Sequence, residues 1–124
     1  MVELHHVSLE VPPDEVERTV EFWRVLGFER LPAPDAIADY VTWLERGDTQ
    51  IHLIHTSQPS VPTLGHPAIV APGDFEATVA ALRDAGFEFE ESQELWGERR
   101  GFAVAPAGHR VEVMAAPPPP GTAG

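Results

Sequence analysis

The hydrophobic and polar positions of this chain follow the same pattern twice. Each half begins with a short stretch of alternating apolar and polar residues, at 3–11 and 66–71, which is typical of a strand with one buried face. An amphipathic segment follows each of them. Three further short apolar stretches complete each half: 28–31, 39–45 and 49–55 in the first, and 87–91, 99–105 and 109–115 in the second. The pattern therefore predicts the order βαβββ twice.

The two amphipathic segments carry apolar residues at helical spacing on one face. These residues are Val16, Val20, Trp23 and Leu26 in the first segment and Phe75, Val79 and Leu82 in the second. Gly27 and Gly86 follow the segments at the position where a left-handed C-terminal cap favours glycine. Asp14, with Glu17 three residues later, predicts a capping box at the start of the first helix.

An offset of 60 positions relates the two halves. His66 lies 60 positions after His6, and Glu112 lies 60 positions after His52. A period this long that occurs only twice indicates a duplicated module and not a solenoid. We expect one α+β domain made of two βαβββ modules, 1–55 and 66–116, whose mixed sheets curve around a shared cleft. A linker, 56–65, joins them, and a Pro- and Gly-rich tail, 117–124, is expected to be disordered or extended.

Strand alternation predicts which side chains share a face. A hairpin around Arg46-Gly47-Asp48 pairs positions whose numbers sum to an odd value, so His52 shares its face with Val41 and Trp43. The repeat predicts the equivalent arrangement in the second module.

Four side chains of ligand type fall at the same two positions of each module: His6, His52, His66 and Glu112. Three imidazoles and one carboxylate suit one divalent Zn, Fe, Ni, Co or Mn ion and do not suit Ca. On an octahedral ion these four would leave two positions open, and on a tetrahedral ion they would close the site. The linker can place the four in one chain or in two. The other histidines are read as non-ligands, since His5 and His55 lie on the wrong strand faces and His109 lies in a turn.

Composition narrows the possible partners. The chain of 124 residues is 43% hydrophobic, contains no Cys and has a net charge of −12. The absence of Cys excludes disulfides and thiolate sites, and the acidic balance argues against nucleic acid. The acidic surface either maintains solubility or attracts cationic ligands. Neither a signal-like N-terminus nor an apolar run long enough to span a membrane is visible, so we expect a soluble, cytoplasmic protein.

Three segments resemble the vicinal oxygen chelate superfamily, which includes glyoxalase I, extradiol dioxygenases, fosfomycin-resistance and bleomycin-resistance proteins. His6-Val7-Ser8-Leu9-Glu10-Val11 resembles the first strand of that family, and Val20 to Phe28 resembles the end of its helix. Ala105 to Val113 resembles its closing hairpin, with Ala105-Pro106-Ala107-Gly108 in place of the usual Asp-Pro-Asp-Gly. The resemblance covers about residues 3–115 and implies a glyoxalase/dioxygenase-like fold.

The resemblance also implies roles for the four residues of ligand type. The metal ligands of the family fall on His6, His52, His66 and Glu112, and His52 replaces a residue that is a carboxylate in glyoxalase I. The resemblance therefore leaves this chain with one of the two metal-bound carboxylates that glyoxalase I uses for its isomerisation. Glu112 either serves as a ligand only or detaches and acts as the catalytic base.

Two classes of function remain at this point. The first is a metal-dependent lyase, isomerase or dioxygenase that acts on a small molecule with adjacent oxygens. The second is a non-catalytic protein of the bleomycin-resistance type that sequesters a small molecule. In either case Trp43, Trp96 and Arg100 are predicted to bind the ligand, with Arg100 meeting an anionic group. The small modules and the resemblance both predict a homodimer.

Overall fold

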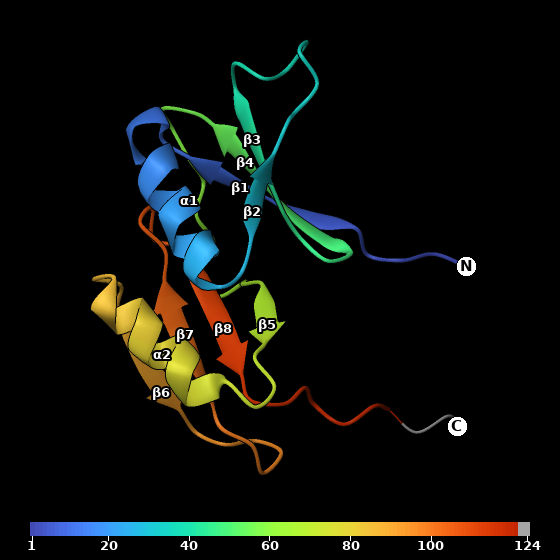
Figure 1. Cartoon of the computed structure of the whole chain (residues 1–124), viewed down its shortest axis with the longest axis vertical. Coiled ribbons are helices and arrows are strands. Elements are labelled where there is room, and N and C mark those ends of the chain that lie inside the picture. Colours follow the sequence, from blue (N-terminus) through green and yellow to red (C-terminus); the bar gives the residue numbers. More distant parts are fainter. Residues whose placement is uncertain (122–124) are drawn as a thin grey trace.

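The computed structural model of the chain describes residues 1–121, and its elements follow the predicted order (Figure 1). The first module comprises β1 (His6–Val11), α1 (Val16–Val25), β2 (Glu29–Leu31), β3 (Val41–Arg46) and β4 (Thr49–His55). The second comprises β5 (Ala68–Val70), α2 (Phe75–Asp84), β6 (Phe89–Ser92), β7 (Arg100–Val104) and β8 (Arg110–Met114). The predicted tail has no helix or strand up to residue 121, and residues 122–124 lie outside the described residues.

Each module forms one four-stranded mixed sheet with the same topology. The strand orders are β1-β4-β3-β2 and β5-β8-β7-β6. The first strand of each module pairs in parallel with the last, and the remaining neighbours are antiparallel. This repeated topology confirms the α+β fold with a duplicated module.

One face of each sheet packs against the helix of its own module, and the helices join the two modules. The predicted apolar faces of α1 and α2 are buried, together with the strand residues Leu9, Val11, Leu44, Leu53, Val111 and Val113. Figure 1 shows both helices on the same side of the molecule. Across the boundary the rings of Phe22 and Phe87 meet edge to face at 5.2 Å, and Arg18 donates a hydrogen bond of 2.6 Å to the carbonyl of Ala85.

The helix ends agree only in part with the sequence prediction. Gly27 and Gly86 have φ values of 92° and 88°, as the left-handed caps require. The predicted capping box is wrong, because the turn Pro13–Glu15 is a 3-10 helix and α1 begins only at Val16. Asp14 is thus too early in the chain to reach the first amides of α1. Neither helix in residues 1–121 combines the length and apolar character needed to cross a bilayer.

Candidate metal and substrate site

The predicted ligands lie on the sheet faces that point away from the helices. In the first module, Trp43 of β3 pairs directly with His52 of β4, and Val41 pairs with Ile54. Paired residues share a face, so the predicted side of His52 is confirmed. In the second module, Phe102 of β7 pairs with Glu112 of β8, which places both on the corresponding face.

The first module holds three aromatic rings in a row, which we call the histidine stack: His6, His52 and Trp43. The ring of His52 lies parallel to both of the others, with centroids 3.9 Å from His6 and 4.4 Å from Trp43. Nε2 of His52 also hydrogen-bonds to Oε1 of Gln50 at 2.7 Å. With the amide oxygen as acceptor, Nε2 carries the hydrogen and Nδ1 keeps the lone pair.

The environment of the stack favours a neutral His52. Burial, and to a lesser degree charge on His6 and His5, lowers the pKa of His52. A neutral imidazole is the form that binds a metal ion. The parallel rings of His6 and His52, however, direct their lone pairs into separate planes. Both can bind one ion only after one of the rings rotates.

The second module holds a contact of 3.1 Å between an imidazole nitrogen, Nε2 of His66, and a carboxylate oxygen, Oε1 of Glu112, which we call the His66–Glu112 pair. Nδ1 of His66 lies 2.8 Å from the carbonyl oxygen of Leu64 and donates to it. Nε2 of a neutral His66 therefore presents its lone pair to Oε1 of Glu112, 3.1 Å away. The other carboxylate oxygen, Oε2, accepts a hydrogen bond of 3.2 Å from Arg100.

The geometry of the His66–Glu112 pair fits a shared cation. Two lone pairs that face one another at 3.1 Å repel unless a proton or a metal ion lies between or beside them. Ligand atoms that each lie about 2.1 Å from one ion and are seen from it at a right angle are about 3 Å apart. A backbone carbonyl that accepts the other ring hydrogen is also the usual second partner of a metal-binding histidine. His66 and Glu112 therefore fit the group that the resemblance implies.

A pocket of about 520 Å³ adjoins the His66–Glu112 pair, and we call it the Trp96 pocket. The indole of Trp96 is fixed at its rim because Nε1 donates a hydrogen bond of 3.0 Å to the carbonyl of Ala116. The pocket has a mainly apolar wall beside the His66–Glu112 pair and the guanidinium of Arg100. Its lining consists of His66, Ala68, Leu95, Trp96, Arg100, Phe102, Glu112, Met114 and Pro118.

The four predicted ligands are brought together as two pairs within one chain and not as one cluster. Among residues 1–121 no three His, Asp or Glu side chains are placed to hold one metal ion. The two predicted tryptophans are divided in the same way, since Trp43 lines a hollow of about 480 Å³ with Leu31 and Val41, and Trp96 lines its own pocket.

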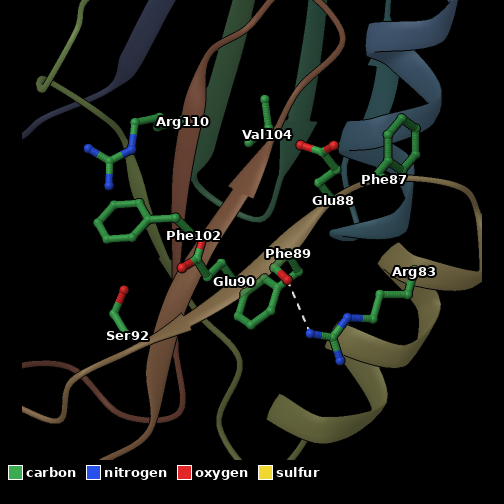
Figure 2. Close-up of a pocket in the computed structure, with 9 residues that line it drawn as sticks. All are labelled: Arg83, Phe87, Glu88, Phe89, Glu90, Ser92, Phe102, Val104 and Arg110. Atoms are coloured by element: carbon green, nitrogen blue, oxygen red, sulfur yellow. Dashed lines mark hydrogen bonds between the residues drawn. The ribbon is translucent and has the colours of Figure 1, made fainter.

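A hollow of about 720 Å³ in the second module lies beside the candidate site, and none of the predicted site residues lines it. Figure 2 shows that it curves around the free edge of β6, with Arg110 and Phe102 on one side of the strand and Arg83 on the other. Cζ of Arg110 lies 4.0 Å from the centroid of Phe102. Phe102 lines this hollow and the Trp96 pocket, and so connects the two.

The three histidines read as non-ligands have different surroundings. His55 lies on the helix side, where Nε2 is 2.8 Å from the hydroxyl of Thr42. His5 lies at the edge of the histidine stack, with its Nδ1 2.9 Å from Nδ1 of His6. His109 is buried in the β7–β8 turn, and neither ring nitrogen has a partner in the described part of the chain.

Sequence reasoning missed two residues of the site, Gln50 and Phe102. Gln50 orients His52, and the edge of His66 meets the ring of Phe102 at a centroid distance of 4.9 Å. Both could have been found, because each lies two positions along a strand from a predicted site residue and therefore on the same face.

Comparison with known proteins agrees with this architecture. The model of the Glyoxalase/Bleomycin resistance protein/Dioxygenase superfamily matches residues 3–113. No curated protein sequence matches the chain. A glyoxalase family protein of Bacillus anthracis superposes with a TM-score of 0.80 at 22% identity, covering 92% of this chain and 94% of that one.

The fosfomycin resistance protein FosX of Listeria monocytogenes is also similar in structure. It superposes with a TM-score of 0.78 at 16% identity, covering 94% of this chain and 93% of that one. A FosX variant complexed with Mn(II) and 1S,2S-dihydroxypropylphosphonic acid superposes with a TM-score of 0.77 at 16% identity, over 94% of this chain and 92% of that one. On the family match, this chain belongs to the Glyoxalase/Bleomycin resistance protein/Dioxygenase superfamily.

Proposed function

We propose that the chain is a metal-dependent enzyme that acts on a small molecule with two adjacent oxygens, as a lyase, isomerase or dioxygenase. One observation carries the proposal: two atoms of metal-ligand type, Nε2 of His66 and Oε1 of Glu112, lie 3.1 Å apart, while Nδ1 of the same ring is bound to the carbonyl oxygen of Leu64. The Mn(II) complex of FosX, a protein with the same fold, supports a divalent metal ion for this chain as well.

The proposed metal ligands are His6, His52, His66 and Glu112, and the ion is Zn, Fe, Ni, Co or Mn. When bound, such an ion would polarise the two substrate oxygens and stabilise negative charge that develops on them. The contact of 3.1 Å between Nε2 of His66 and Oε1 of Glu112 supports this role for both residues. Glu112 also remains the candidate general base, because it is the only carboxylate in the proposed set.

We propose further that each site is completed by two copies of the chain in a homodimer. Support comes from the division of the four residues into the histidine stack on one sheet and the His66–Glu112 pair on the other. The exposed apolar residues Ile54 and Val104, on the open sheet faces, and Leu95, in the Trp96 pocket, favour a partner surface there. In such a dimer Trp43 of one copy and Trp96 of the other would shield the substrate from water.

A second candidate function is sequestration of a small molecule without turnover. Trp43, at the end of the histidine stack, favours it, because this indole lines a hollow of about 480 Å³ and can stack on a flat or cationic ligand without any metal ion. The net charge of −12 would attract such a cation.

Titration of the protein with catechols, 2-oxo acids and hydroxamates separates the two functions, with Trp fluorescence as the readout. The metal-loaded protein should bind at least one of these chelating compounds, and treatment with a chelator should abolish that binding. The fluorescence of Trp96 and Trp43 reports on both parts of the proposed site. Binding that survives metal removal unchanged would favour the sequestering protein over the enzyme.

A further inference from the structure

Arg100 is a largely buried cation with few partners in the wall of the Trp96 pocket. Its side chain is 13% exposed, and its Cζ lies 5.9 Å from the ring centroid of Trp96 and 5.8 Å from that of Phe102. A guanidinium has five N–H donors. Among the described residues only Nη1 finds an acceptor, Oε2 of Glu112, and the buried Nε has none.

The neighbouring Arg99, in contrast, has hydrogen-bond acceptors for its guanidinium donors. It points to the other face of the sheet, where Nε and Nη2 each donate a hydrogen bond of 2.9 Å to the carboxylate of Glu91. Arg99 is 43% exposed, so its remaining donors can reach water. Buried donors are nearly always paired in folded proteins, and an unpaired one is unfavourable. Arg100, more buried and less paired than Arg99, therefore has donors left for a ligand in its pocket.

Building on the proposed function, we infer that the substrate carries an anionic group, a carboxylate or a phosphonate, besides its two adjacent oxygens, and that Arg100 binds this group. The guanidinium fork matches both kinds of anion and forms strong, charge-assisted hydrogen bonds with them. Glu112 uses Oε2 for Arg100, which leaves Oε1 beside His66. The proposed metal ligands and the proposed anion-binding guanidinium are thus adjacent in the pocket, so a short substrate can reach both.

The negative net charge of the chain bears directly on the binding of an anionic ligand. A net charge of −12 repels an anion, so a preference for an acidic ligand requires a local cation. Arg110 is the alternative cation on this face, because it lies against Phe102 and has no carboxylate partner among residues 1–121. Arg99, on the opposite face, provides a matched control.

The experiment measures the binding of three matched probes to the metal-loaded protein: succinic monohydroxamate, its neutral amide, and the analogue with a phosphonate tail. All three carry the same pair of chelating oxygens. We expect the wild-type protein to bind at least one charged probe about tenfold or more tightly than the amide. Which charged probe binds more tightly then identifies the anion as carboxylate or phosphonate.

In the Arg100→Gln variant, compared on the metal-loaded protein, the ratio of charged-probe affinity to amide affinity should fall to about one. The Arg99→Gln variant should keep the wild-type ratio. Equal binding of all three probes to the wild type would overturn the inference but leave the proposed function intact. The inference would also be overturned if Arg110→Gln, and not Arg100→Gln, removed the preference for a charged probe. Equal weakening of all three probes by Arg100→Gln would overturn it as well, because that result is expected of a residue that only positions Glu112. Metal-independent binding, or no binding of any probe, would overturn the proposed function and the inference together.

Discussion

The most informative single residue in the candidate site is His66, because its hydrogen bond to a backbone carbonyl fixes where its free lone pair points. Leu64 accepts from Nδ1 at 2.8 Å, so Nε2 of the neutral ring faces the carboxylate of Glu112. Neither residue alone would indicate a metal ion. The proposal of a metal ion rests on their orientation toward each other, in which Arg100 binds the second carboxylate oxygen of Glu112.

His109 is a residue whose environment has a direct consequence for stability. It is 3% exposed, and neither ring nitrogen has a partner in the described part of the chain. Burial lowers its pKa, and Glu10 only partly opposes this. The unfolded chain therefore binds a proton at a higher pH than the folded protein does.

We predict that the protein loses stability as the pH falls from the ordinary histidine pKa, about 6.5, toward the lowered pKa of folded His109. Above that window the contribution of this residue is fully present. The His109→Leu variant should lose less stability at acid pH than the wild type does. Near neutral pH it should be more stable by roughly 1 kcal/mol, because the change replaces two unpartnered polar atoms. Urea unfolding of both proteins between about pH 5 and pH 8 measures this. Identical pH profiles would show that the ring is solvated.

At the scale of the elements, β7 has no room for a side chain at Gly101, where it pairs with Glu91 of β6. Gly101 lies on the helix side of β7, and a Cβ built on it would be 2.5 Å from the carbonyl oxygen of Glu90 and 2.5 Å from the ring of Phe89. Glycine is therefore required here for lack of space, although its backbone conformation is ordinary.

We predict that Gly101→Ala destabilises the protein by about 1–3 kcal/mol, since the new methyl group must displace strand backbone as well as a ring. Gly65→Ala is the matched control, because the nearest atom to its Cβ, in Pro62, is 3.5 Å away. That variant should change stability by no more than about 0.5 kcal/mol. Urea unfolding midpoints of the two variants give the comparison, and a Gly101→Ala protein as stable as the control would contradict this packing.

The element scale is also where sequence reasoning succeeded. Alternation along the strands and the odd sum of the hairpin register predicted that His52 shares its face with Val41 and Trp43. The structure confirms this and pairs His52 directly with Trp43. The buried faces of the two helices were predicted equally well, because the spacing of apolar residues along a helix depends only on local geometry. The predicted bounds of β4 agree with the structure, and other strand ends differ from the prediction by up to three residues. Asp14 failed as a cap because a turn of 3-10 helix precedes α1.

What local patterns could not predict is how distant surfaces meet. The face of each ligand follows from alternation, but the rotation of the rings in the histidine stack depends on contacts with Trp43 and Gln50. Likewise, the pairing of Arg100 with Glu112 joins two strands whose register was not predicted. The repeat predicted two pairs of residues of ligand type but contained no information on whether one chain brings the two pairs together.

At the scale of the whole molecule, the two modules are joined through their helices, and their ligand-bearing faces remain open. The contact between Phe22 and Phe87 and the hydrogen bond from Arg18 lie on the helix side. The histidine stack and the His66–Glu112 pair consequently do not meet in one chain. A dimer in which each copy supplies one of them to the same site would resolve this separation.

We predict a particle of about twice the 13.6 kDa of the chain by light scattering, with sites shared between copies. A His6→Ala/His52→Ala variant and a Glu112→Ala variant should each bind little metal. After mixing and refolding, heterodimers would contain one intact site, so metal content should recover to about a quarter of the wild-type value. A mixture that holds no more metal than the separate variants would contradict shared sites, and a monomer would exclude them.

The most direct test of the whole account is the metal content of the purified protein, measured by elemental analysis beside two single variants. We predict about one Zn, Fe, Ni, Co or Mn ion per chain in the wild type. His66→Ala should lose most of it, because that change removes one of the two proposed ligand atoms that lie 3.1 Å apart. His55→Ala should retain it, since His55 lies on the helix side against Thr42. A wild-type protein that takes up none of these metals, or equal losses in the two variants, would contradict the account.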